Sequence, residues 1–182
     1  MDQILLTQII EAILFSSQFA LTPKQIAKSI GIKKTGEIRQ AIKDLNTFYQ
    51  DHNRSFFIQK VADGFQLRSD PKFKKWIKRG HIVKTIQLSP SVLETLSIIA
   101  YNQPVTRSEI EEIRTVDSTY SLRSLLDKNL IKIAGKKEIP GRPLLYKTSN
   151  YFLELFGFEA LNDLPRPEDF DIMSPQDNET VI

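Results

Sequence analysis

The side chains that most often carry catalysis or bind metals are sparse in this sequence. The chain has no cysteine, which excludes thiolate catalysis, disulfides and cysteine-based metal sites. Its two histidines, His52 and His81, lie in different segments, and neither has a serine or carboxylate partner at a motif spacing. The seven glycines are scattered singly, so the sequence contains no glycine-rich phosphate loop. We therefore predict no catalytic residue, no metal site and no cofactor, and hence a protein that is not an enzyme.

One group of acidic residues has the composition of a metal site. On a helix, Glu109 and Glu112 would share a face because they are three residues apart, whereas Glu111 would point elsewhere. Asp117 follows a few residues later. We interpret Glu109 as a helix-capping residue and the others as part of a solvated acidic face.

A second possibility is DNA binding, which helix-turn-helix proteins achieve by presenting Arg, Lys, Asn or Gln from a third helix to base edges. The first half of the chain offers basic and amide residues around such a helix: Lys33, Lys34, Arg39, Gln40 and Lys43. The second half offers a near-neutral set with an acidic start: Asp117, Ser118, Tyr120, Arg123, Ser124 and Asp127. Because the two halves do not form one consistent DNA-reading surface, we expect at most a weak or indirect DNA contact and favour a protein partner.

The stretch at 138–146 is rich in residues that shape a loop. Pro140 and Pro143 stiffen it, and Gly141 permits a tight bend between them. Arg142 is thereby held where its guanidinium could make a bidentate contact with a partner. The alternative is that Arg142 ties the loop to its own domain, for example at a helix C-terminus.

The first element that must support these residues is a helix predicted from Ile4 to Phe15. Nine of its residues are apolar, and at about 100° per residue they occupy far more than the single stripe of a surface helix. One face can serve the local core. The surplus apolar surface requires a second partner, either another segment of the chain or another subunit.

Two further helices are predicted next. Thr22, Pro23 and Gln25 form a helix start of the capping-box type, and this helix should end near Gly31. A third helix is predicted at 35–49 from its apolar periodicity. The order of elements so far is that of a helix-turn-helix.

A hairpin and a basic helix complete the first half. Strands are predicted at 56–61 and 65–69, with Asp63 and Gly64 as the tight turn because glycine tolerates positive φ. A basic helix is predicted at 71–79. Its apolar side consists of Phe73, Trp76 and Ile77.

The second half repeats this order of elements. Thr106 corresponds to Thr22 at an offset of 84, and at that offset the apolar residues of the second and third helices stay in register. The predicted elements are a helix opened by Ser89-Pro90, a capping box from Thr106 to Glu109, a third helix capped by Asp117 or Ser118, strands at 131–134 and 144–148, and a last helix at 151–156.

These elements predict a mainly α protein with small β-hairpins, of the α+β class, built as two tandem winged-helix domains. We expect the domains at 1–85 and 86–163. The tail at 164–182 contains three prolines, mixed acids and little periodicity, which predicts a disordered acidic segment. A single extended domain is the rival interpretation.

Charge is unevenly distributed along the chain. Residues 1–85 hold 15 Lys or Arg and 7 Asp or Glu, for a net charge of +8, whereas residues 86–182 hold 10 and 15, for −5. The basic half could attract nucleic acid or an acidic protein, or it could be a solvated lysine-rich surface. The sequence has no apolar run long enough to span a membrane, and Met1-Asp2-Gln3 lacks the basic start of a secretory signal. We therefore expect a cytoplasmic protein.

The second half resembles the bacterial segregation and condensation protein B (ScpB) family. The matching segments are Leu88-Ser89-Pro90, Leu93 to Arg107, Glu109 to Arg114, Val116 to Ser118, Pro140-Gly141-Arg142-Pro143 with Tyr146, Phe152 to Glu154, Phe156-Gly157 and Asp163 to Pro165. The first half matches more loosely, through Glu11 to Phe15 and Asp63 to Leu67. Together these segments cover most of residues 5–165.

This resemblance implies a non-catalytic homodimer that binds the kleisin ScpA, and through it the Smc ATPase, in chromosome condensation and segregation at the nucleoid. It also implies that the N-terminal domain forms the dimer and that the C-terminal domain holds the kleisin. We expect the dimer contact to involve the first helix: Leu5, Ile9 and Ile13. We expect the kleisin to contact an apolar groove on the second domain and its wing, although these residues could equally be core: Leu93, Ile98, Tyr101, Arg142, Leu144 and Tyr146.

Overall fold

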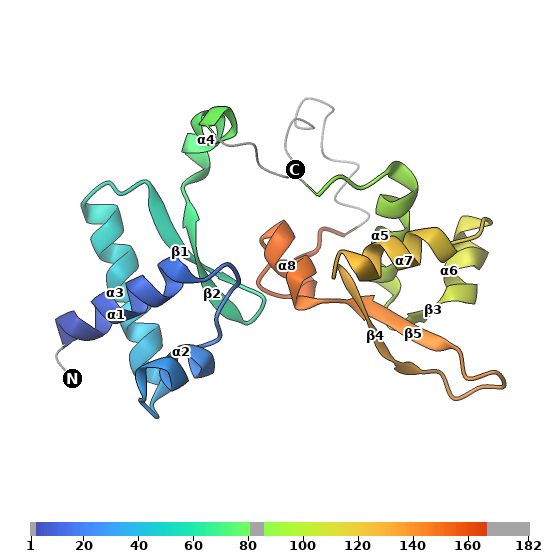
Figure 1. Cartoon of the computed structure of the whole chain (residues 1–182), viewed down its shortest axis with the longest axis horizontal. Coiled ribbons are helices and arrows are strands. Elements are labelled where there is room, and N and C mark those ends of the chain that lie inside the picture. The colour runs from blue at the N-terminus through green and yellow to red at the C-terminus, as the bar shows by residue number, and fades with distance from the viewer. Residues whose placement is uncertain (1–2, 81–85, 167–182) are drawn as a thin grey trace. The chain divides into compact units, whose positions relative to one another are not determined.

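The computed structural model describes residues 3–80 and 86–166, and the chain forms two compact units (Figure 1). The first unit comprises Met1–Lys84 and the short segment Gly157–Ala160, and the second comprises Thr85–Phe156 and Leu161–Ile182. Among the described helices, none combines the length and apolar character needed to cross a membrane. The acidic tail predicted at 164–182 lies, beyond Arg166, outside the described residues.

The first unit has the helix, helix, helix, hairpin order of a winged helix. Its elements are α1 (Gln3–Ser16), α2 (Pro23–Ile30), α3 (Thr35–Asp51), β1 (Phe56–Val61), β2 (Gly64–Ser69), the 3-10 turn η1 (Pro71–Phe73) and α4 (Lys74–Gly80). The predicted helices are present with ends moved by one or two residues. The basic segment predicted as one helix at 71–79 is divided between η1 and α4.

The start of α2 follows from its first residues. Thr22 Oγ1 accepts a hydrogen bond from the backbone N–H of Gln25 at 3.3 Å, and Gln25 Oε1 accepts one from the N–H of Thr22 at 2.8 Å. Two donors that the helix start would leave unpaired are thus satisfied, and Pro23 occupies the first helical position, where no donor is needed. Gly31 ends the helix with a φ of 81°, a left-handed conformation that glycine adopts without strain.

The wing of the first unit is the antiparallel hairpin β1–β2. Its two turn residues are Ala62 and Asp63, both with positive φ, so the turn predicted at Asp63 and Gly64 is wrong by one residue. Gly64 is needed for another reason, because a Cβ there would lie 2.9 Å from the backbone carbonyl of Leu21. Leu21 approaches this closely because it exchanges two backbone hydrogen bonds of 2.9 Å with Phe65.

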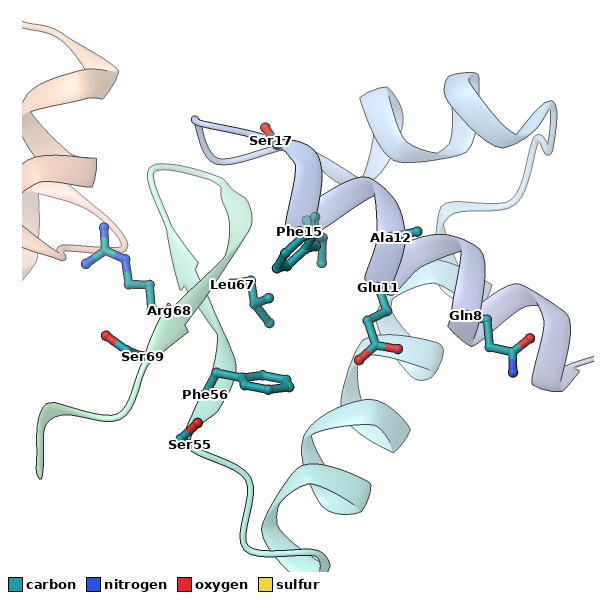
Figure 2. Close-up of a pocket in the computed structure, with 11 residues that line it drawn as sticks. Gln8, Glu11, Ala12, Phe15, Ser17, Ser55, Phe56, Leu67, Arg68 and Ser69 are labelled. Atoms are coloured by element: carbon teal, nitrogen blue, oxygen red, sulfur yellow. The ribbon is translucent and has the colours of Figure 1, made fainter. Parts of the chain in front are cut away.

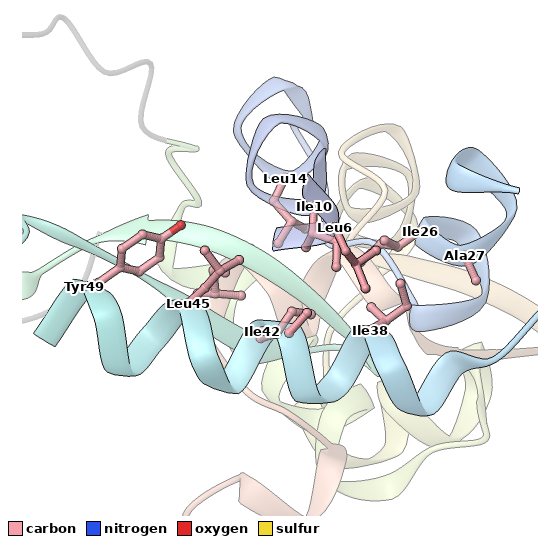
Figure 3. Packing of buried hydrophobic residues seen from close by; sticks show 11 residues of the cluster. Leu6, Ile10, Leu14, Ile26, Ala27, Ile38, Ile42, Leu45 and Tyr49 are labelled. Carbon is pink, nitrogen blue, oxygen red and sulfur yellow. The ribbon is translucent and has the colours of Figure 1, made fainter. Parts of the chain in front are cut away.

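An apolar core joins the three helices of the first unit (Figure 3). Each helix contributes an isoleucine with no exposed surface, namely Ile10 of α1, Ile26 of α2 and Ile38 of α3. Figure 3 shows the apolar residues of α3 in a row along one side of the helix, facing side chains of α1 and α2. The other buried members are Leu6, Leu14, Ala27, Ala41, Ile42, Leu45, Tyr49 and Ile58.

The second unit repeats this order and adds a short strand. Its elements are α5 (Pro90–Asn102), β3 (Val105–Thr106), α6 (Arg107–Arg114), α7 (Thr119–Asp127), β4 (Ile131–Lys136), β5 (Leu144–Thr148), α8 (Asn150–Phe156) and the 3-10 turn η2 (Leu161–Asp163). The three strands form one sheet in the order β3-β5-β4, in which Val105 pairs with Tyr146.

The starts of α6 and α7 use polar side chains in different ways. Thr106 and Glu109 form the predicted capping box of α6. At α7 the N-cap position is Ser118, whereas the acceptor for the N–H of Thr119 is Asp117 Oδ1 at 3.0 Å. Both residues predicted for that start therefore take part in it.

The core of the second unit contains a buried arginine. The Arg114 side chain is 4% exposed, and its Nη2 donates to Ser91 Oγ at 2.9 Å and to Glu94 Oε2 at 3.1 Å. Its Nη1 donates to Ser118 Oγ at 3.3 Å. A buried guanidinium requires such partners because its desolvation would otherwise be costly. The surrounding core is apolar and includes Val92, Leu96, Ile99, Ile110, Leu122, Leu125 and Leu130.

Candidate partner-binding surfaces

The acidic residues of α6 serve the helix start and its contact with the wing. Glu109 accepts from the N–H of Thr106 and pairs with Lys137 Nζ at 2.5 Å. The hydrogen bond from Lys137, with those from Thr106, lowers the pKa of Glu109 to about 2. Glu112 is exposed, as expected for a solvated face.

The two remaining acids stabilise the turn between α6 and α7. Glu111 accepts from the N–H of Ser118 at 2.9 Å and from Arg107 Nε at 2.7 Å, and these bonds hold its pKa below the usual range. Arg107 Nη2 also donates to Asp117 at 2.6 Å, while the N–H of Thr119 lowers the pKa of Asp117. Within residues 3–80 and 86–166, no three His, Asp or Glu side chains are placed to share a metal ion.

The described histidine is part of a helix end. His52 Nδ1 lies 2.9 Å from the backbone carbonyl oxygen of Phe48, and the two rings are 4.0 Å apart between centroids. His81 lies outside the described residues. The contacts of His52 are those of a residue that closes α3.

The residues predicted for dimerisation form a row along the flank of α1, about 100° from the row that fills the core. Leu5 is 49% exposed, and Ile9 and Ile13 are half-buried. Ile4 and Phe15, near the two ends of the same helix, are 68% and 79% exposed. Because its opposite side fills the core, α1 carries apolar surface on both sides, as its sequence predicts.

A groove of about 700 Å³ separates α1 from the hairpin (Figure 2). Phe15 of α1 and Leu67 of β2 face each other across it, and Phe56 of β1 points into it. The Glu11 carboxylate lines the groove and accepts a hydrogen bond of 2.9 Å from Tyr49 Oη. Burial raises the pKa of Tyr49, and the bond to Glu11 raises it further, so the phenol stays protonated and the pair ties α1 to α3.

A second groove of about 680 Å³ lies between α1 and α3. It shares Gln8 and Glu11 with the first and is lined by Ile4 and by Phe48, which is 46% exposed. Phe48 was not among the predicted site residues. Phe48 lies three residues after the core residue Leu45 and therefore borders the buried side of α3. A large aromatic residue at that border is the sequence signal that could have identified it.

Three of the predicted kleisin-binding residues lie on the outer side of α5. At 100° per residue, Leu93, Ile98 and Tyr101 fall within an arc of about 140°. Leu93 and Tyr101 are 41% and 44% exposed and Ile98 is half-buried, so Leu93 does not share the core side of the helix with Val92. Tyr101 Oη donates to the backbone oxygen of Pro165 at 2.6 Å.

The other three predicted residues belong to the wing of the second unit. Arg142 donates to Glu138 Oε1 at 2.8 Å within its own loop, and both side chains are largely exposed. Gly141 and Arg142 both have positive φ, which confirms the tight bend. Leu144 is half-buried, whereas Tyr146 is 9% exposed and belongs to the core.

An apolar patch at the turn from α6 to α7 was not predicted. Ile113, Val116 and Tyr120 are 56%, 53% and 76% exposed. Ile113 lies three residues after the buried Ile110, so its spacing alone predicts an inward position, whereas the structure exposes it.

Acidic residues of this chain serve helix starts and ion pairs, and its two winged-helix units carry exposed apolar surfaces. These features define the class of protein that binds other macromolecules. Residues 8–167 match the family model described as segregation and condensation complex subunit ScpB. The segregation and condensation protein B of Syntrophotalea carbinolica is 43% identical over 170 residues, which are 93% of this chain and 86% of that protein. That of Symbiobacterium thermophilum is 40% identical over 167 residues, 92% and 75% of the two chains.

A solved structure, described as a dimer of the ScpB N-terminal domain complexed with ScpA peptide, is 21% identical and covers 46% of this chain and 92% of that one, with a TM-score of 0.38. The family match and the identity to the curated relatives settle the assignment: this chain belongs to the ScpB family. It is a subunit of the segregation and condensation complex, a non-catalytic role, and is therefore not an enzyme.

Proposed function

We propose that this chain acts as a homodimer that binds the kleisin ScpA and, through ScpA, the Smc ATPase, at the nucleoid in the cytoplasm. In this proposal the first domain (1–85) forms the dimer and the second (86–163) holds the kleisin. The observation that carries the proposal is the apolar surface on both sides of α1, which exceeds what the core of one unit uses. Burial of a leucine-sized side chain contributes about 1.5–3 kcal/mol, so a few such residues suffice for a stable dimer.

The dimer is tested by placing charges on α1. We expect Leu5→Glu with Ile9→Glu to give a monomer by size-exclusion chromatography with light scattering, while circular dichroism keeps the helix content. The control is Ile133→Glu, because Ile133 is 51% exposed on the wing of the second unit and should leave the dimer intact. A variant that unfolds would place Leu5 and Ile9 in the core, and a variant that stays dimeric would exclude this face.

The kleisin contact is tested separately with the full chain. We expect Leu93→Glu with Tyr101→Ala to weaken ScpA binding at least tenfold by isothermal titration, with the dimer unchanged. The α1 double variant is the informative comparison, because the solved relative pairs an ScpB N-terminal-domain dimer with an ScpA peptide. If the α1 variant loses ScpA while Leu93→Glu with Tyr101→Ala keeps it, the kleisin contact belongs to the first unit.

A further inference from the structure

The basic segment that follows the first wing has no assigned role. From Pro71 to Arg79, five of nine residues are Lys or Arg and none is acidic: Lys72, Lys74, Lys75, Lys78 and Arg79. All five are exposed. Lys72 pairs with Asp70 at 2.8 Å, whereas in the described part of the chain the four cations of α4 make no ion pair.

The four cations of α4 share one side of the helix. At 100° per residue, Lys74, Lys78, Lys75 and Arg79 fall within an arc of about 140°. The half-buried Ile77 and the 63% exposed Trp76 occupy the opposite arc. Both i,i+4 pairs within the cationic arc are like-charged, which destabilises a helix that has no counterion. The arrangement is therefore self-repelling and would be stabilised by a polyanion.

We propose that this face of α4 binds the phosphate backbone of duplex DNA without reading its sequence. Duplex DNA carries one negative charge per ~1.7 Å of its axis. This dense and uniform row of phosphates can pair with cations that repeat every four residues along a helix. The segment contains no Asn or Gln to pair with adenine edges, and four of its five cations are lysines, whose point charge suits phosphate oxygens. Membership of a segregation and condensation complex favours DNA over an acidic protein as the polyanion.

The proposal does not depend on the dimer or kleisin contacts, and it locates the weak DNA contact expected from the sequence on α4 rather than on the third helix of either unit. Four neutralised phosphates predict a slope of about −3.6 for the logarithm of affinity against that of salt. Between 50 and 200 mM salt the affinity should then fall roughly 150-fold.

The chain offers its own reporter, because Trp76 is its only tryptophan and lies on α4. Titration of the full chain with a random 30-base-pair duplex should change the Trp76 fluorescence, with the stated salt slope. Anisotropy of the labelled duplex gives an independent readout for variants. We expect Lys74→Gln, Lys75→Gln, Lys78→Gln and Arg79→Gln together to lower affinity more than tenfold and to reduce the slope to near zero.

The matched control removes four exposed cations around α2 instead: Lys24→Gln, Lys28→Gln, Lys33→Gln and Lys34→Gln. It changes net charge equally and should keep most of the affinity and slope. If it loses as much as the α4 variant, binding reflects net charge alone and the proposal is overturned. Equal affinity for poly-glutamate, or tight binding to phosphatidylglycerol vesicles without DNA binding, would overturn it in favour of another anion. Lys75→Gln with Arg79→Gln should halve the slope, which covers the case in which the quadruple variant does not fold.

Discussion

The two units use one scaffold with different interiors. α2 and α6 begin 84 residues apart, as do α3 and α7, and the helices α2 and α6 both end in a left-handed residue, Gly31 or Thr115. Leu21 and Val105, also 84 apart, each pair with the second strand of their wing. Both halves therefore share three features of the fold. The second helix begins with a capping box, it ends in a left-handed residue, and the segment before it pairs with the second strand of the wing.

What differs is the residue that faces inward at the end of the second helix. The first unit has the half-buried Ile30, and the second has the buried Arg114 at the equivalent position. The third helices also differ, since α3 has 17 residues and α7 has nine. The shared residues thus set the fold, while the residues free to differ set interior polarity and the surfaces offered to partners.

The largest expected effect tests the shared part of the scaffold. Ile26 and Ile110 are equivalent, and neither has exposed surface. We expect Ile26→Ala and Ile110→Ala each to cost about 2–5 kcal/mol, because each removes buried methylenes and leaves a cavity. Amide hydrogen exchange, read separately for each unit, should show loss of protection in the mutated unit. A cost more than twofold larger in one unit would break the equivalence of the two cores.

The next effect tests the part that differs. Arg114→Ile gives the second unit the residue of the first and removes hydrogen bonds to Ser91, Glu94 and Ser118. We expect a cost of about 1.5–3 kcal/mol in the free energy of unfolding by urea, the range for hydrogen bonds to a charged group. Glu94→Gln is the control. Its side chain is 57% exposed, so its cost should stay below about 1 kcal/mol. A neutral Arg114→Ile would mean that the polar cluster adds no net stability.

The sequence predicts the local features of this fold better than its long-range ones. The capping boxes at Thr22 and Thr106 were predicted correctly because their chemistry lies within four residues. The pairing of Leu21 with Phe65 was not predicted. This pairing brings the backbone of Leu21 so close to position 64, one residue past the turn, that only glycine fits there. On the candidate surfaces, apolar spacing predicted the surplus apolar surface of α1. It did not decide whether Leu93 lines a groove or belongs to the core, because the exposure of a side chain depends on neighbours distant in sequence.

A smaller effect concerns the left-handed residues. Thr115 has a φ of 59°, which costs a β-branched residue about 1–2 kcal/mol, whereas at Gly31 a Cβ would meet no atom within 4 Å. We therefore expect Thr115→Gly to raise stability by about 1 kcal/mol and Gly31→Thr to lower it by about 1–2 kcal/mol, measured by thermal unfolding. Stability changes of opposite sign in these two variants would support the view that α2 and α6 end in equivalent left-handed residues. A loss in Thr115→Gly would mean that the bond of its hydroxyl to the Arg114 carbonyl outweighs the strain.

The smallest effect separates the two capping boxes by pH. The third residue is Gln25 in the first unit and Glu109 in the second, so only the second box titrates. The pKa of Glu109 is lowered from 4.5 to about 2 in the folded chain. Its contribution is therefore present above about pH 4.5 and is lost as the pH falls toward 2. Because the side chain is 38% exposed, we expect this contribution not to exceed about 1 kcal/mol.

Glu109→Gln gives the second box the chemistry of the first and is the matched test. The amide can still accept from the N–H of Thr106 but does not attract Lys137 as an ion. Unfolding by urea at pH 6 and pH 3 should show the parent second unit losing more stability on acidification than the variant, with the first unit unchanged between the two proteins. Equal acid losses in parent and variant would place the acid sensitivity of the second unit elsewhere, in Glu111 and Asp117, whose pKa values are also lowered by hydrogen bonds at the turn.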